Sequence, residues 1–192
     1  MTSAARLVAL LEGLEQEGTS VVELACGGAA PEAWRLYPGE YGVFDRRTKS
    51  QAYFHSHGPD CEEVGHFHTA RLFADRTAHL VAISMAPTGW PRALFTVNLW
   101  AIGDAWEPAE QLKRYVRHFR IDESRGDPRV VRFVNLVFEA YRSEIEALQD
   151  AKAEALTAHR LARPGVDVFA DRALEVTSLV EIDARVRLAA PG

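Results

Sequence analysis

The chain has 192 residues and a formal net charge of −5, a length that suits one domain with a sizeable hydrophobic core. The acidic balance argues against general affinity for nucleic acid, and two cysteines are too few for a disulfide scaffold. No segment has the long apolar run of a membrane span, and the first residues do not resemble a signal peptide. We therefore expect a single domain over residues 1–192, in the cytoplasm, with no nucleic-acid or membrane partner.

The first expected element is an amphipathic helix that ends near Gly18. Four leucines recur in it at helical spacing, and Thr2 or Ser3 can cap its start. The segment SVVELA (20–25) then predicts a short strand. The stretch that follows is typical of a loop, with a turn at Pro38-Gly39.

From residue 41 the pattern predicts an antiparallel meander of about five strands. Short apolar segments alternate with turn-forming residues, and sequential strands with short connections usually pair antiparallel. The predicted strands are YGVF (41–44), SQAYFHSH (50–57), HFHTARLF (66–73), AHLVAISM (78–85) and ALFTVNLW (93–100).

Beyond residue 107 the apolar spacing becomes helical. One helix starts after Pro108, and a second starts at Asp127-Pro128 and runs to about Leu161. So long a helix must bend or pack on a partner, which makes 128–161 our candidate for a homodimer contact. The tail, 174–188, fits either strand or helix. The expected fold class is α+β, with an N-terminal helix, the sheet, and two or three C-terminal helices.

Basic residues are frequent between residues 113 and 132, where acidic residues interrupt them. Such a stretch can receive an anion. Because both signs of charge alternate along helices, we interpret it as a solvated helix face.

Four of the seven histidines fall within YFHSHGPDCEEVGHFH (53–68), as two HxH pairs. Residues i and i+2 of a strand point to the same face, so His55 and His57 should project together, as should His66 and His68. If the intervening residues close a hairpin, His57 lies opposite His66 and His55 opposite His68. Opposed Cβ atoms are then about 5 Å apart.

Phenylalanines alternate out of phase with these histidines, at Phe54, Phe67 and Phe73. This phase predicts one apolar face toward the core and one face that carries the histidines. Histidines packed together without a metal would repel one another or lose their charge on burial. The pattern therefore predicts a metal site held by His55, His57, His66 and His68.

Imidazole suits iron, copper and zinc alike, so the identity of the metal stays open. If the protein is an enzyme, a metal-dependent oxygenase or hydrolase acting on a small molecule fits. A fully closed four-histidine shell would instead favour a structural or metal-handling role. The alternative class is a non-catalytic binding or assembly protein that uses the histidines as a structural polar cluster.

The loop between the two pairs is acidic. Glu62 and Glu63 are the candidate catalytic residues, because a carboxylate beside a metal-bound water can act as general base. Asp60 or Cys61 could add a metal ligand from the same loop, and a simply solvated loop is the other interpretation.

Three segments, LYPGEYGVFDRRTKSQAYFHSH, GHFHTARLF and HLVAISM…ALFTVNLWAIGDAW, resemble an uncharacterised bacterial family known only as a domain of unknown function. The resemblance covers most of the chain. It implies that the HxH…GHFH region is a defining feature, and it implies no activity.

Two shorter motifs resemble metal-binding families only in part. HSHGPDCE is similar to the first half of the cupin motif H-x-H-x4-E, which would use His55, His57 and Glu62 and implies a metal-binding β-barrel. The second cupin motif is not evident. FHSHG is similar to the start of the JAMM metallopeptidase motif, H-x-H-P-x6-S-x2-D, but Gly58 replaces its proline and His68 its aspartate.

Overall fold

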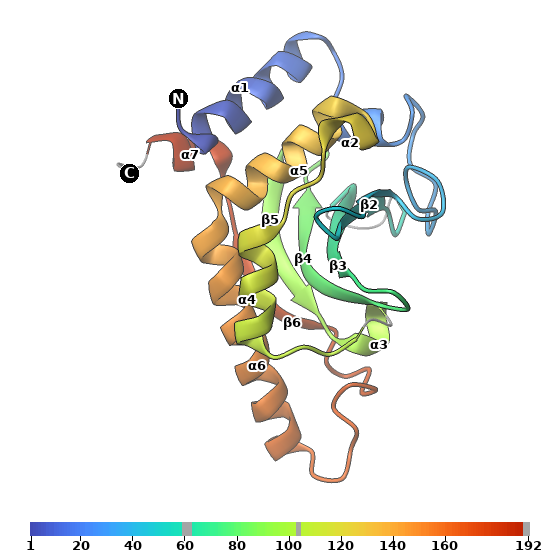
Figure 1. Ribbon diagram of the computed structural model, residues 1–192, viewed down its shortest axis with the longest axis vertical. Helices are drawn as coiled ribbons and strands as arrows, with labels where there is room; N and C mark the ends of the chain where they lie inside the picture. The colour runs from blue at the N-terminus through green and yellow to red at the C-terminus, as the bar shows by residue number, and fades with distance from the viewer. Residues whose placement is uncertain (59–62, 103–104, 190–192) are drawn as a thin grey trace.

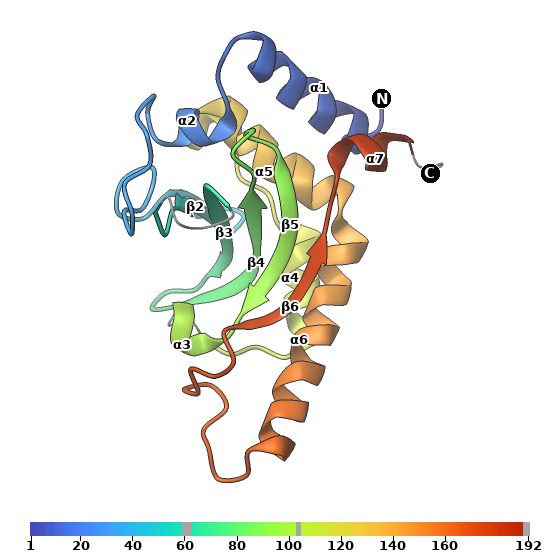
Figure 2. The same cartoon turned by 180° about the vertical axis from the view of Figure 1, so that it is seen from behind.

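A six-stranded antiparallel sheet, with its strands in sequence order from β1 to β6, forms the centre of the molecule. The computed structural model describes residues 1–58, 63–102 and 105–189. Helices α4, α5 and α6 lie over one face of the sheet (Figure 1), and the view from behind shows the other face in front of them (Figure 2). The expected α+β class is confirmed, with six strands rather than five.

The strands are β1 Val43–Asp45, β2 Ser50–His55, β3 Gly65–Leu72, β4 Thr77–Met85, β5 Pro91–Val97 and β6 Val176–Glu181. The tail supplies the sixth strand, which pairs antiparallel with β5. Hydroxyls support this pairing, since Thr96 Oγ1 lies 2.7 Å from Thr177 Oγ1. A short helix, α7 Ala184–Ala189, follows β6, so the tail contains both of the elements between which its pattern could not decide.

The helices are α1 Ser3–Gln16, α2 Val21–Ala25, α3 Leu99–Ile102, α4 Ala109–His118, α5 Pro128–Ala140 and α6 Arg142–Ala162, with a 3-10 turn at Glu123–Arg125. The prediction of a strand at 20–25 is wrong. Ser20 Oγ accepts a hydrogen bond from Glu23 N at 3.2 Å. The spacing Ser-x-x-Glu is a helix-start signature, and here it outweighs the β preference of the two valines between them.

The predicted long helix consists of two helices, α5 and α6, which meet at Tyr141-Arg142. Their apolar side is buried within the chain, including Val134, Val137 and Ile145. The chain's own core therefore accounts for the apolar side that had suggested a partner, and the homodimer stays a prediction. None of the helices in the described part of the chain is long and apolar enough to cross a bilayer.

The core lies between the sheet and the helices. Phe54 and Phe67 project from neighbouring strands with ring centroids 5.0 Å apart, and Phe67 lies 5.5 Å from Phe133 of α5. Fully burying a phenylalanine side chain contributes about 1.5–3 kcal/mol to stability. The expected separation of an apolar and a histidine-bearing face is confirmed for these two positions. Phe73 follows the end of β3 and is only partly buried.

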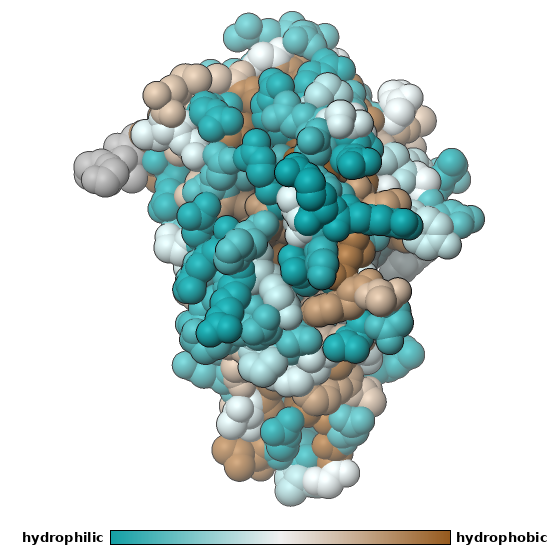
Figure 3. Space-filling model, viewed as in Figure 1, coloured by the Kyte–Doolittle hydropathy of each residue, from teal (hydrophilic) through white to brown (hydrophobic). Residues whose placement is uncertain are grey.

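The solvent side of the helices is largely hydrophilic (Figure 3). Several of its basic residues are paired with acidic ones: Lys113 Nζ lies 2.7 Å from Asp150, and Arg117 Nη2 lies 2.6 Å from Glu146. The interpretation of this stretch as a solvated helix face agrees with these pairs.

Candidate metal centre

The histidine-bearing strands pair in a register two residues away from the predicted one. His55 is opposite His66, and Tyr53 is opposite His68. The predicted pairing is wrong because β2 ends at His55. Ser56 instead bridges Ala33, and its carbonyl accepts a hydrogen bond from Trp34 N at 2.8 Å. A shift of two residues preserves the face of every side chain, so the histidines still project together.

Three imidazoles converge through the same ring atom. His66 Nε2 lies 2.7 Å from His55 Nε2 and 3.0 Å from His68 Nε2. His66 and His68 are buried and His55 is partly buried, and one donor atom of each lies within 4.8 Å of the others. Nitrogen ligands at 2.0–2.1 Å from an octahedral or tetrahedral ion are about 2.9–3.4 Å apart. The 3.0 Å separation of His66 and His68 lies in this range and the 2.7 Å separation of His55 and His66 lies just below it, so the three histidines could hold one ion after a small adjustment.

Hydrogen bonding alone cannot satisfy this arrangement. An imidazole nitrogen carries either one proton or one in-plane lone pair. Whether it is protonated or not, His66 Nε2 can form a good hydrogen bond with His55 or with His68, but not with both at once. A metal ion between the rings would accept one lone pair from each, which removes the conflict.

The surroundings of His55, His57 and His68 favour their neutral forms. Burial, followed by the nearby His66 and His57, lowers the pKa of His55 to about 3. Burial and then His79 hold the pKa of His68 well below its usual value. Burial also lowers the pKa of His57, with His66 as the next cause. Neutral rings keep the lone pairs that metal binding requires.

Glu63 lies behind His66, on the side away from the convergent nitrogens. Its Oε1 is 2.5 Å from His66 Nδ1, and its Oε2 accepts a hydrogen bond from Ser84 Oγ of β4. Burial alone would raise the pKa of Glu63, but the hydrogen bonds with His66 and Ser84 outweigh burial and lower it. A carboxylate on Nδ1 directs the lone pair to Nε2, as in carboxylate–histidine–metal arrangements.

His79 contacts His68 from behind, as Glu63 contacts His66, and little in the sequence pointed to this role. Its Nε2 lies 3.0 Å from His68 Nδ1, and it is fully buried. By strand alternation His79 should face the core with Val81 and Ile83. The register shift between Thr69 and Ala70 places His79 opposite Ala70, on the histidine face. Only its position at the start of the adjacent strand hinted at this role.

His57 lies beside the three histidines but is not part of the convergent group. Its ring stacks on that of Trp34, with the ring centroids 4.6 Å apart, and its centroid lies 5.1 Å from that of the His66 ring. Trp34 is 70% exposed and has a φ of 67°, an unusual conformation for a bulky residue. Of the loop residues considered as bases or ligands, Asp60, Cys61 and Glu62 lie outside the described residues.

A family model described as a domain of unknown function (DUF6969) matches residues 1–182. The chain belongs to this family. No curated protein and no solved structure matches it. In the described residues the sheet has β1 and β6 at its two edges, unlike the β-barrel that the cupin resemblance implies. The function of this DUF6969 member must therefore be inferred from its own geometry.

Proposed function

We propose that the protein binds one divalent transition metal ion through Nε2 of His55, His66 and His68. The convergence of these three nitrogens carries the proposal, because neither hydrogen bonds nor apolar packing explains it. Burial of two of the rings and the lowered pKa of His55 and His68 support it as well. The fourth predicted ligand, His57, remains a candidate at the rim of the site.

Three protein ligands favour a catalytic type of site. Structural zinc sites have four protein ligands, whereas catalytic ones keep a position for water or substrate. Zinc-assisted hydrolysis needs such a position, and so does an oxygen-dependent reaction at iron or copper. We therefore propose a metal-dependent enzyme, a hydrolase or an oxygenase, that acts on a small molecule.

Within this proposal Glu63 is a positioning residue rather than a general base. Both of its oxygens are engaged, by His66 and by Ser84, on the far side of the His66 ring. Its role would be to keep the His66 proton on Nδ1. His79 would receive the Nδ1 proton of His68 in a hydrogen bond in the same way.

Elemental analysis of untagged protein tests the proposal. Protein purified and then loaded separately with zinc, ferrous iron or copper should retain about one ion per chain after desalting. His66→Ala and His55→Ala should each lose the ion, and the wild-type metal would separate hydrolytic from redox chemistry. His118→Ala is the matched control, because His118 lies on the exposed surface of α4 and, among the described residues, hydrogen-bonds only to Arg114 O.

His55→Ala is included because His55 is only partly buried, so its loss should destabilise the fold less than loss of the buried His66. Failure of the wild-type protein to retain any of the three metals would overturn the proposal. Equal loss from His118→Ala would do the same, and the histidines would then form a structural polar cluster.

A further inference from the structure

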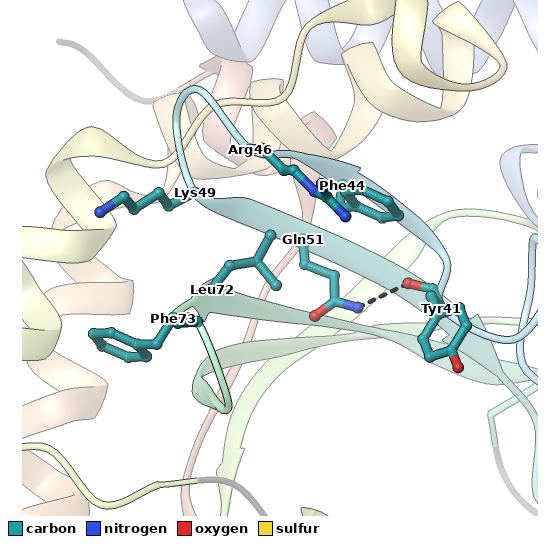
Figure 4. Close-up of a pocket in the computed structure, with 8 residues that line it drawn as sticks. Tyr41, Phe44, Arg46, Lys49, Gln51, Leu72 and Phe73 are labelled. Carbon is teal, nitrogen blue, oxygen red and sulfur yellow. Dashed lines mark hydrogen bonds between the residues drawn. The ribbon is translucent and has the colours of Figure 1, made fainter.

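A pocket of about 710 Å³ lies beside β1, β2 and the end of β3 (Figure 4). Its lining residue Gln51 is on the same face of β2 as His55, so the pocket opens on the face that carries the histidines. Its volume is in the range of small-molecule sites. Its apolar lining includes Tyr41, Phe44, Leu72 and Phe73. Tyr41 is 68% exposed and Phe44 38% exposed, although aromatic side chains gain much by burial. This lining suits an apolar ligand body.

The floor of the pocket continues toward the three histidines. Gln51, Tyr53 and His55 alternate on β2 and therefore share one face. Gln51 lines the pocket, and its Nε2 donates to Tyr41 O at 2.8 Å. The Tyr53 ring follows, 5.2 Å from the His68 ring. From Gln51 to His55 the strand spans about 13 Å, so only an elongated ligand can reach from the pocket to the centre.

The charged side chains of the lining are both cationic, Arg46 and Lys49. Lys49 also lines a neighbouring pocket of about 480 Å³, together with Arg47, Arg71 and Arg114. Among the described residues, Arg47 alone of these five has a carboxylate within 4.0 Å, Asp122 at 3.8 Å.

Arg71 adds to this imbalance, because its Nε is buried without a hydrogen-bond partner in the described part of the chain. Elsewhere on α4, by contrast, Lys113 and Arg117 are paired with carboxylates. In a chain of net charge −5, this end of the sheet has a local excess of positive charge, which the carboxylates of Asp45 and Asp122 offset only in part. Such an excess attracts anions.

We infer that the pocket binds an elongated amphipathic anion, with its acidic group at Arg46, whose guanidinium lies beside the Phe44 ring, and its apolar body along Phe44 and Leu72. Lys49 points away from Arg46 (Figure 4) and adds to the positive charge around the pocket. The free end of the body is directed over Tyr53 toward His55 and His68. The role of this anion as a substrate rests on the proposed metal centre, whereas its binding in the pocket does not. An acyl carboxylate is the simplest ligand of this class.

Dodecanoate, used below its micellar concentration, tests the inference by titration calorimetry against its neutral methyl ester. The acid should bind at least tenfold more tightly than the ester, and hexanoate should bind more weakly than dodecanoate. Arg46→Gln combined with Lys49→Gln should weaken dodecanoate binding at least tenfold. Arg47→Gln is the matched control, from the same turn but outside the pocket, and should stay within twofold of the wild type.

An ester that binds as well as the acid would overturn the inference, and so would an equal loss in Arg47→Gln. The His66→Ala variant should lose the metal but still bind dodecanoate. Failure of the metal proposal can therefore be told apart from failure of the binding inference. In protein loaded with Co²⁺, the paramagnetic effect on bound dodecanoate should be larger at the terminal methyl protons than beside the carboxylate. The reverse order would show that the chain is not directed toward the histidines.

Discussion

His66 has a central position among the histidines, since its two ring nitrogens face different partners. Nε2 contacts His55 and His68, while Nδ1 contacts the Glu63 carboxylate. A carboxylate so placed both fixes the tautomer and raises the basicity of the ring as a ligand. The consequences of single substitutions here follow from which of these two contacts is lost.

Glu63→Gln should weaken metal binding about 10–100-fold, the usual effect of removing an outer partner of a metal-ligating histidine. The amide keeps the shape of the side chain but loses the charge that holds the proton on Nδ1. Competition with a chromophoric chelator measures the affinity. Glu32→Gln removes an exposed carboxylate paired with Arg35 and should leave the affinity unchanged. An unchanged affinity in Glu63→Gln would show that Glu63 does not orient His66.

Asp45 is a second buried carboxylate, and its charge is stabilised by backbone hydrogen bonds. It is fully buried at the end of β1, where Arg47 N donates to Oδ1 at 2.9 Å and Asp122 N donates to Oδ2 at 3.1 Å. Burial raises the pKa of Asp45, but the backbone hydrogen bonds, with Arg47 first, outweigh burial and lower it. Its charged form therefore stabilises the native state.

Asp45→Asn should lower the free energy of unfolding by about 1–3 kcal/mol at pH 7, as for hydrogen bonds to a charged group. Because the native pKa is below the unfolded value of about 3.9, the wild-type advantage is complete above that pH and is lost as pH falls through the native pKa. Urea unfolding between pH 7 and pH 3 measures the difference. Asp75→Asn, at an exposed position, should differ little from wild type throughout. A pH-independent gap for Asp45→Asn would contradict the assignment.

At the scale of elements, the register of β2 against β3 decides which histidines meet. Gly65 begins β3 and has a φ of 150°, in the region that favours glycine. A Cβ at this position would overlap the carbonyl oxygen of His55 and the ring of Phe54. The close approach of the two backbones at this end of the hairpin therefore requires glycine, one residue before His66.

Gly65→Ala should destabilise the protein by at least about 2 kcal/mol, since overpacking against backbone is poorly relieved. It should also weaken metal binding, because the pair His55–His66 would separate. Denaturant unfolding and a metal titration measure the two effects. The matched control is Gly13→Ala in α1, where a Cβ meets nothing within 4 Å. That change should stabilise by about 0.5–1 kcal/mol. Equal effects of both changes would refute the role given to Gly65.

At the scale of the molecule, the two faces of the sheet have separate tasks. Helices α4, α5 and α6 cover one face of the sheet (Figures 1 and 2). Phe54 and Phe67 project from that face, whereas the histidines and the pocket-lining Gln51 share the opposite one. The chain ends also meet, because Arg185 of α7 lies 3.3 Å from Glu15 of α1. Stability thus comes mainly from one face and the proposed chemistry from the other, so an ion bound between β2 and β3 should stabilise the whole domain.

A metal at 100 times its dissociation constant should raise the stability by about 2.7 kcal/mol. At about 2–4 °C per kcal/mol for a chain of this size, the melting temperature should rise by about 5–10 °C. Thermal unfolding with added zinc, and again with excess chelator, measures this shift. His55→Ala should show no shift, whereas His118→Ala should keep all of it. A rise of the same size in His55→Ala would mean that zinc binds elsewhere.

Much of the fold was predictable because local pattern was enough. Short apolar segments between turn-forming residues identified five strands, and helical spacing identified the first helix and the helical stretches after residue 107. The phase of Phe54 and Phe67 against the histidines identified the core face. Alternation along each strand assigned the histidines to one face, and a register error of two residues could not change that assignment. The expectation of a histidine cluster therefore needed only the local sequence.

The tertiary structure decided which side chains converge. The end of β2 depends on Ser56 pairing with Ala33, a contact that no local pattern signals. His79 joins through a bulge in the pairing of β3 with β4, and β6 finds its place only by pairing with β5, about 80 residues earlier in the chain. Along an unbroken stretch of strand, local sequence determines which face a side chain takes, because alternation is a property of one strand. Register and bulges depend on two strands at once, so the three-histidine geometry could be read only from the folded chain.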